Sequence, residues 1–171
     1  MTLHEDAVKT LTAMPAGEFR SRTLDLLALG PAVMQRQHVA GHITASTMIV
    51  HEDRQRVLLC LHGRFHRWLQ LGGHCEEGDE TLVGAALREA TEESGIDGLT
   101  FDPVPIGVSV FDVPFCKAGP TVHYDVRFAA LAPAGAIERV SPESKRLGWF
   151  EPGALPSPLA SATEELVAPA L

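Results

Sequence analysis

The stretch GGHCEEGDETLVGAALREATEESGI, residues 72 to 96, decides the fold and indicates the chemistry. It places a glycine turn before a helical pattern that carries Glu89, Glu92 and Glu93. These positions are i, i+3 and i+4, so on a helix they share one face. Three crowded carboxylates repel each other unless water solvates them or a cation neutralises them. Mg²⁺ suits such a face, because it prefers hard oxygen ligands.

We expect a helix over residues 79 to 95. Asp79 follows a glycine and could cap the first free amides of the helix. Gly95 lies where a helix would end in a left-handed residue. An apolar stripe beside the acidic face would anchor the helix, and its members recur at i, i+4 and i+7: Val83, Leu87 and Ala90.

Residues 73 to 96 resemble the signature of the Nudix hydrolases, G-x5-E-x7-R-E-U-x-E-E-x-G-U, in which U is a bulky apolar residue. The second half of the signature matches residues 88 to 96, read as Arg-Glu-Ala-Thr-Glu-Glu-Ser-Gly-Ile. Ala90 is small for its apolar position. The complete acidic half behind a glycine turn is what carries the resemblance.

The first half of the signature departs from the family pattern. Counted from Gly73, the position of the expected glutamate holds Asp79, and Glu80 comes one place later. Glu80 keeps the family spacing to Arg88. The glycine loop is therefore expected to be one residue longer than usual, which leaves the roles of Asp79 and Glu80 open.

The resemblance implies a magnesium site, in which Mn²⁺ could substitute. It assigns metal ligation to the side chains of Glu89, Glu92 and Glu93 and to the backbone carbonyl of Gly73. Arg88 would orient the carboxylates by ion pairing, and Glu92 lies at i+4 from it. The alternative for each glutamate is a solvated helix face. The three glutamates and Arg88 are the candidate catalytic residues.

The activity implied is the hydrolysis of a pyrophosphate bond, either in a nucleoside diphosphate linked to another moiety or in a nucleoside triphosphate. Divalent ions can polarise a phosphoryl oxygen and lower the pKa of bound water. Two alternatives stay open. One is a catalytically silent Nudix module that senses a nucleotide. The other is an enzyme like isopentenyl diphosphate isomerase, which shares the fold and uses a cysteine, here Cys75. The intact acidic helix favours hydrolysis.

The general base has several candidates. Glu89 or Glu93 could hold the attacking water, and some relatives instead use an acid from a distant loop, for which Glu143 and Glu164 are candidates. The alternative for Glu143 and for Glu164 is that each is an exposed glutamate without a catalytic role.

Three side chains are candidates for substrate binding. His74 lies inside the glycine turn and could touch phosphate, and Phe65 and Phe115 lie on predicted loops where they could stack on a base. The other histidines, among them His62, His66 and His123, are expected to be surface or hydrogen-bonded core residues, because their spacing matches no common transition-metal motif.

Composition sets the broader class. The 171 residues suit one domain, and 45% hydrophobic with 21% charged residues is ordinary for a globular protein. The net charge of −8 and the lack of a basic cluster argue against polymeric nucleic acid as a partner. Three cysteines without a CxxC pair indicate a reducing compartment. Neither a signal peptide nor a membrane span is visible, so a cytoplasmic location is expected.

The predicted fold class is α/β, an α/β/α sandwich of the Nudix type with a mixed sheet and additional N-terminal helices. Residues 1 to 40 would form a helical extension packed on the core or a homodimer contact, and residues 41 to 171 the Nudix hydrolase domain. The expected elements are helices over residues 3–13, 20–29 and 162–167, a turn over 32–37, strands over 43–51, 55–62, 68–71, 104–113, 122–131 and 146–151, and a loop over 115–120.

Overall fold

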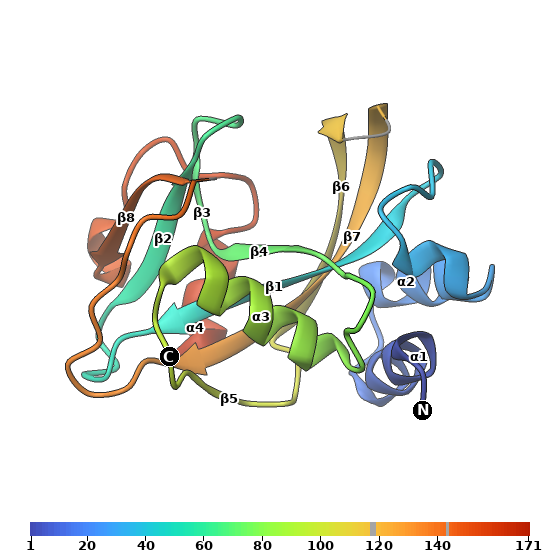
Figure 1. Ribbon diagram of the computed structural model, residues 1–171, viewed down its shortest axis with the longest axis horizontal. Helices are drawn as coiled ribbons and strands as arrows, with labels where there is room; N and C mark the ends of the chain where they lie inside the picture. The colour runs from blue at the N-terminus through green and yellow to red at the C-terminus, as the bar shows by residue number, and fades with distance from the viewer. Residues whose placement is uncertain (117–118, 143) are drawn as a thin grey trace.

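A mixed sheet with helices on both faces forms the protein (Figure 1). The structure is a computed structural model. It describes residues 1–116, 119–142 and 144–171, apart from the side chain of Phe115. Within this part of the chain the strands are β1 His42–Val50, β2 Val57–His62, β3 Trp68–Leu69, β4 Leu71–His74, β5 Thr100–Phe101, β6 Gly107–Cys116, β7 Gly119–Leu131 and β8 Ser144–Phe150. The helices are α1 Leu3–Ala13, α2 Glu18–Leu27, α3 Leu82–Ser94 and α4 Val167–Ala170, with the short 3₁₀ turns η1 Pro31–Met34, η2 Pro152–Ala154 and η3 Glu164–Leu166.

Strand β1 lies at the centre of the sheet. It pairs in parallel with β7, with His42 opposite His123 and Val50 opposite Leu131. It also pairs antiparallel with β2 and with β4. The remaining described pairings, β2 with β3 and β8 and β7 with β5 and β6, are antiparallel. The predicted mixed sheet is confirmed, and β1 connects the signature segment to the later strands.

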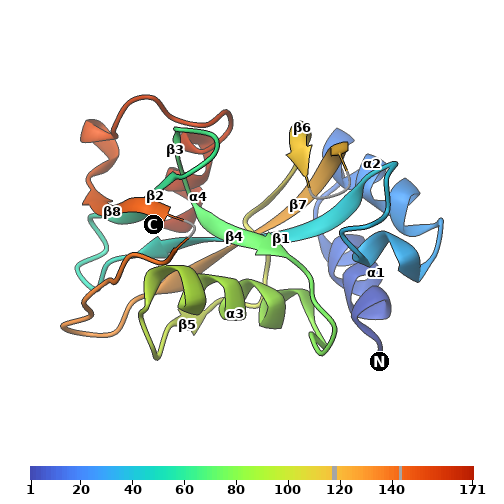
Figure 2. The same cartoon turned by 45° about the horizontal axis from the view of Figure 1, so that its top comes forward.

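Alternate residues of β1 face the two helical layers. Ile43 and Ala45 share a hydrophobic cluster with side chains of α3 and the N-terminal helices. Met48 and Val50 pack instead with Val167 of α4. Figure 1 shows α3 in front of β1 and α4 behind it, and Figure 2 shows the same layers from another angle. Since successive side chains of a strand point to opposite faces, one strand holds the α/β/α sandwich together.

The N-terminal helices pack at one end of the sandwich, beside the start of α3 (Figure 2). Ala7 and Leu11 of α1 are buried in the same cluster as Leu82 of α3. The carboxylate of Asp6 accepts a hydrogen bond from the backbone N–H of Leu82 at 2.8 Å. This acceptor satisfies one of the free amides at the helix start. The division into residues 1–40 and 41–171 stays a prediction.

The start of α3 corrects the sequence prediction. The helix begins at Leu82, and Thr81 rather than Asp79 caps it, because the Thr81 hydroxyl accepts the N–H of Gly84 at 3.0 Å. The end is as expected: Gly95 has φ +65°, a left-handed conformation that costs glycine little.

The buried stripe of α3 also differs from the expected one. Leu87 is 40% exposed and Val83 is only half-buried. Ala90 is buried as expected, and the other buried apolar residues of the helix are Leu82, Ala85 and Ala86. Alanine at three of these positions allows the helix axis to approach the sheet closely, and the Thr47 hydroxyl of β1 donates to the carbonyl of Ala86.

Two other segments differ from the predicted elements. A loop was expected over residues 115 to 120, but β6 continues to Cys116 and β7 begins at Gly119; residues 117 and 118 lie outside the described part. The expected helix over 162 to 167 is η3 followed by α4. The sequence favoured a loop here because it contains Pro114 and Pro120, and proline is uncommon inside strands.

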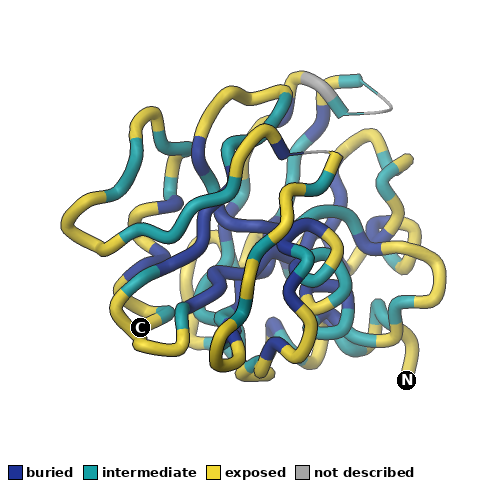
Figure 3. The backbone as a smooth tube through the Cα atoms, turned by 60° about the vertical axis from the view of Figure 1, so that its left-hand side comes forward, coloured by how far each residue is buried: buried dark blue, intermediate teal, exposed yellow. Residues whose placement is uncertain are grey.

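Figure 3 shows where the chain is buried: the central strands are largely covered, and the turns at the rim are exposed. No helix in the described ranges has the length and apolar character needed to cross a membrane.

Candidate functional site

Two glycines bring strand β4 unusually close to its neighbours. A Cβ added to Gly72, which has φ +148°, would lie 2.4 Å from the Cα of Ser46. A Cβ on Gly73 would lie 2.8 Å from the carboxylate carbon of Glu89. Cβ atoms in proteins essentially never make contacts this short. At Gly72 the neighbouring atoms belong to the backbone of β1, so a side chain there would displace the strand, whereas at Gly73 a side chain would displace the Glu89 carboxylate, which lies directly against this backbone.

The three carboxylates of α3 occupy different environments. Glu93 is 7% exposed, and its Oε2 accepts a hydrogen bond from the backbone N–H of Gly72 at 2.8 Å. The Glu89 side chain is 15% exposed and lies beside Gly73. The Glu92 side chain is 61% exposed. The predicted acidic face thus runs from buried to solvated, and two of its members are fixed against the glycine turn.

Arg88 connects the helix to this turn. Its guanidinium donates to both carboxylate oxygens of Asp79, at 3.1 and 3.0 Å, and to the carbonyl of His74 at 2.9 Å. It also donates to Glu89 at 3.0 Å and to Glu92 at 3.3 Å. The planar guanidinium suits such a divided role, because its five N–H groups point in fixed directions. These contacts, the hydrogen bonds to Asp79 foremost, raise the pKa of Arg88 further.

Asp79 is the residue whose role the sequence left open. It lies in the longer loop before α3, where its carboxylate also accepts the backbone N–H of Glu76 at 2.8 Å. Burial alone would raise the pKa of Asp79, but the hydrogen bonds from Arg88 and from Glu76 lower it below its usual value. Asp79 is therefore an anion that holds Arg88 and the loop together. Glu80 is exposed.

His74 points away from this set of carboxylates and joins a cluster that sequence reasoning missed. Its ring centroid lies 5.0 Å from that of His42 and 5.0 Å from that of His123. The Sγ atom of Cys116 lies 3.6 Å from His74 Nε2. His62 and His66, the other histidines close to the glycine turn in the sequence, are not members. The predicted contact of His74 with phosphate remains a prediction.

Burial governs the protonation of the clustered histidines. Desolvation, and then the neighbouring charges of the cluster and of Arg36, lowers the pKa of His74 to about 3 and that of His123 to about 4. Desolvation also lowers the pKa of His42. All three imidazoles are therefore neutral at physiological pH.

A buried polar network occupies the sheet face opposite α3. Asp125 of β7 accepts hydrogen bonds from Thr44 at 2.9 Å, from Ser46 at 2.7 Å and from Arg127 at 3.0 Å. Gln70 completes the network, donating to Ser46 and accepting from the Thr163 hydroxyl. The sequence carried a signal for this face, since polar residues alternate with apolar ones at the start of β1.

The remaining candidates lie apart from the carboxylates of α3. Phe65 is partly exposed in the turn after β2, with its ring 4.4 Å from that of His62. Glu164 is exposed in η3, which packs on the opposite sheet face from α3. The Phe115 side chain and Glu143 lie outside the described residues. No described contact joins Phe65 or Glu164 to the glycine turn.

The position of Cys75 disfavours a catalytic role for its thiol. Its side chain is buried in the hydrophobic cluster on the α3 side of the sheet. Desolvation, reinforced by the negative charge of Asp79, raises the pKa of the Cys75 thiol to about 12. A nucleophilic cysteine needs the opposite, a depressed pKa and access to substrate.

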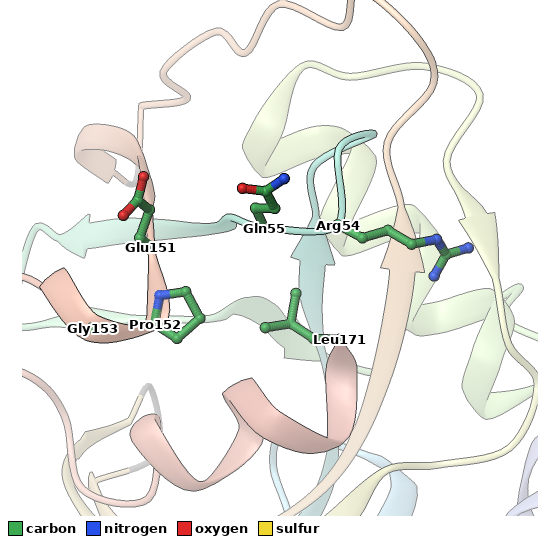
Figure 4. Close-up of a pocket in the computed structure, with 6 residues that line it drawn as sticks. All are labelled: Arg54, Gln55, Glu151, Pro152, Gly153 and Leu171. Carbon is green, nitrogen blue, oxygen red and sulfur yellow. The ribbon is translucent and has the colours of Figure 1, made fainter.

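Two surface hollows lie elsewhere. One, of about 350 Å³, is formed by the β1–β2 turn, the segment after β8 and the C-terminus, at Arg54, Gln55, Glu151, Pro152, Gly153 and Leu171 (Figure 4). In Figure 4 the Arg54 side chain points away from the other five residues. The second, of about 590 Å³, lies at the end of β6 and the start of β7. Neither includes a residue of α3 or the glycine turn.

Comparison with known proteins places this geometry in a family. The model of the NUDIX domain matches residues 41–169. A NUDIX family hydrolase from Clostridium perfringens has a similar structure, with 25% identity, a TM-score of 0.62 and coverage of 75% of this chain and 95% of the other. A MutT NUDIX hydrolase from Burkholderia pseudomallei is 27% identical, with a TM-score of 0.53 and coverage of 77% and 98%.

A third structure has the same fold at lower identity. It is the NUDIX domain of Shewanella oneidensis NrtR in complex with ADP ribose, 18% identical, with a TM-score of 0.56 and coverage of 85% of this chain and 94% of the other. Among curated protein sequences, none matches the chain. Because the signature lies within the matched residues and solved members share the sheet and helix arrangement, the chain belongs to the NUDIX family.

Proposed function

We propose that the protein hydrolyses a pyrophosphate bond in a nucleoside diphosphate linked to another moiety, or in a nucleoside triphosphate, and that the reaction depends on Mg²⁺. The observation that carries the proposal is the contact between Gly73 and the Glu89 carboxylate, with Glu93 bound to the neighbouring Gly72. It places anionic side chains of α3 against a backbone segment free of side chains.

The donor set fits a hard divalent cation. Glu89, Glu92 and Glu93 offer carboxylate oxygens, and Gly73 offers a backbone carbonyl, which are the ligand types that Mg²⁺ and Mn²⁺ prefer. A bound divalent ion would neutralise charge on the pyrophosphate oxygens and lower the pKa of a coordinated water. The positive charge of the ion would then offset the repulsion between the three crowded carboxylates.

The side chains of the protein have separate tasks in this proposal. Arg88 keeps Glu89 and Glu92 oriented while it fixes the loop through Asp79. Orientation is the main requirement in phosphoryl transfer, because positioning and charge stabilisation supply most of the rate enhancement. Glu89 or Glu93 is the proposed general base. Phe65 and Phe115 are proposed to contact the base of the nucleotide.

The isomerase alternative is disfavoured by Cys75. A thiol buried in the core, with its pKa raised to about 12, has neither the charge nor the access of a nucleophile. The sensor alternative differs from the hydrolase in one measurable property, turnover.

A phosphate-release screen tests the proposal. The full chain would be incubated with nucleotide sugars, dinucleoside polyphosphates and nucleoside triphosphates, with Mg²⁺ or Mn²⁺ and with EDTA. We expect turnover of at least one substrate class, dependent on the added cation. Nucleotide binding measured by calorimetry, without turnover of any substrate, would overturn the proposal in favour of a sensor.

A further inference from the structure

The cluster of His42, His74, Cys116 and His123 draws its members from four strands, β1, β4, β6 and β7. His42 lies directly opposite His123, and His74 lies opposite Thr44 of β1. Because side chains alternate along a strand, these pairings place the three histidines on one sheet face, the face opposite α3. One potential ligand atom from each of the four residues lies within 4.8 Å of all the others.

The distances in the cluster are close to those of a tetrahedral metal site. With Zn–N bonds of about 2.0 Å and a Zn–S bond of about 2.3 Å, neighbouring nitrogen and sulfur ligands would be about 3.5 Å apart. The Sγ atom of Cys116 lies 3.6 Å from His74 Nε2 and 3.9 Å from His42 Nε2. The widest separation among the four ligand atoms is within 4.8 Å, so the side chains would have to move closer together on binding.

The hydrogen bonds around the cluster leave nitrogens available for a metal. Nδ1 of His42 lies 3.3 Å from the carbonyl of His38. When Nδ1 carries the proton and donates to that carbonyl, Nε2 keeps its lone pair and faces Cys116. Histidines that bind metals commonly donate their other nitrogen in this manner. In His123, Nε2 is buried and has no hydrogen-bond partner among the described residues. An unsatisfied buried nitrogen is costly, and a metal bond would remove that cost.

We infer that His42, His74, Cys116 and His123 form a binding site for Zn²⁺, separate from the magnesium site proposed at α3. Three imidazoles and one thiolate are ligands that zinc accepts in tetrahedral sites. Carboxylate and carbonyl oxygens, the ligands at α3, instead suit Mg²⁺. Arg36, which is near enough to affect all three histidines, makes a dication less favourable there. The negative charge of the Cys116 thiolate offsets part of that repulsion.

The site would have a structural role, because four protein ligands leave no open position for substrate. His74 is the residue after Gly73, and its carbonyl accepts a hydrogen bond from Arg88. Zinc bound to His74 would therefore tie the glycine turn to β1, β6 and β7. This role assigns His74 to the metal rather than to phosphate. The zinc site does not depend on which substrate is hydrolysed, or on whether any is.

Metal content tests the inference directly. The full chain and its variants would be expressed with zinc, desalted and measured by mass spectrometry for zinc per chain. We expect about one zinc in the wild type. Cys116→Ser and His123→Gln should bind at least about 100-fold more weakly, since even the loss of an outer-shell partner costs 10- to 100-fold. His66→Gln is the matched control, because His66 lies outside the cluster, and Glu92→Gln controls for the proposed magnesium site; both should retain zinc.

Cobalt gives a second measurement that needs no variant to fold. Wild-type protein loaded with Co²⁺ should show tetrahedral d–d bands and a thiolate charge-transfer band, and zinc should protect Cys116 from alkylation. Circular dichroism would show whether each variant is folded. Wild-type protein without zinc, a cobalt spectrum without a thiolate band, or a folded Cys116→Ser protein that binds zinc as tightly as the wild type would each overturn the inference.

Discussion

The carboxylate of Glu93 and the backbone N–H of Gly72 are joined by a hydrogen bond of 2.8 Å. The carboxylate is almost fully buried, so it has lost its contact with water in order to accept the hydrogen bond from this amide. A buried carboxylate is costly unless hydrogen bonds or cations compensate it. Glu93 thus serves two purposes in this family member: it fixes the glycine turn, and it is a proposed ligand of the divalent ion.

Glu93→Gln separates these two purposes. The amide oxygen can still accept the Gly72 N–H, so the fold should persist and the apo protein should be as stable as wild type or slightly more stable, since repulsion within α3 falls. Turnover should fall by about 100-fold or more, as for other losses of an oriented electrostatic group. Thermal melts with and without Mg²⁺, paired with assays on the best screened substrate, measure both effects. Glu77→Gln is the control, because Glu77 is exposed in the loop. Wild-type activity in Glu93→Gln would show that the carboxylate is only structural.

The sequence predicted the glycine turn, the helix and the acidic face because all three depend on neighbours within a few residues. It did not predict the contacts of Asp79, because a loop one residue longer changes which acid reaches Arg88. It also missed the cluster around His74. His42 and His123 become neighbours only through the parallel register of β1 and β7. Long-range register depends on packing of the whole sheet, so no local spacing reveals it.

Arg88→Lys tests the connection between loop and helix. A lysine ammonium cannot bind both oxygens of Asp79 and the carbonyl of His74 at once, because it lacks the planar fork of the guanidinium. We expect a loss of about 1 to 3 kcal/mol in the free energy of unfolding. Turnover should fall at least about tenfold, since the carboxylates lose their orientation. Urea unfolding and steady-state kinetics measure the two effects. Arg64→Lys, in an exposed turn, should change neither. An unchanged Arg88→Lys protein would mean that water replaces these contacts.

Asp6 tests the link between the N-terminal helices and the signature helix. Its carboxylate accepts the N–H of Leu82 at the start of α3. Asp6→Ala leaves that amide without this acceptor and should lower the free energy of unfolding by about 1 kcal/mol, as for other lost caps. Asp6→Asn, which still offers an oxygen, should lose less. Asp25→Ala, at an exposed site of α2, is the control. Equal stability of Asp6→Ala and wild type would show that the contact contributes nothing.

Cys75→Ala tests whether hydrolysis uses a thiolate. The Cys75 side chain lies in the core behind the glycine turn, and the proposed chemistry needs only oxygen ligands and water. We therefore expect the variant to keep most of the wild-type turnover, and Cys75→Ser to keep turnover while losing some stability, because its hydroxyl would be buried. Kinetics on the best screened substrate is the measurement. A loss as large as that of Glu93→Gln would revive the isomerase-like mechanism.

The same thiol predicts a dependence of stability on alkaline pH. The pKa of Cys75 rises from 9.0 to about 12 on folding, chiefly because burial disfavours the thiolate. The folded state therefore holds this proton more tightly than the unfolded state does. The resulting contribution to stability is complete below about pH 9 and is lost as the pH rises from 9 towards 12. Cys60 behaves in the same manner, with its pKa also raised to about 12. Urea unfolding at neutral pH and at about pH 10 should show a decline in the wild type that is smaller in Cys75→Ala. An equal decline in both proteins would mean that the Cys75 thiol is already ionised, or exposed to water, in the folded state.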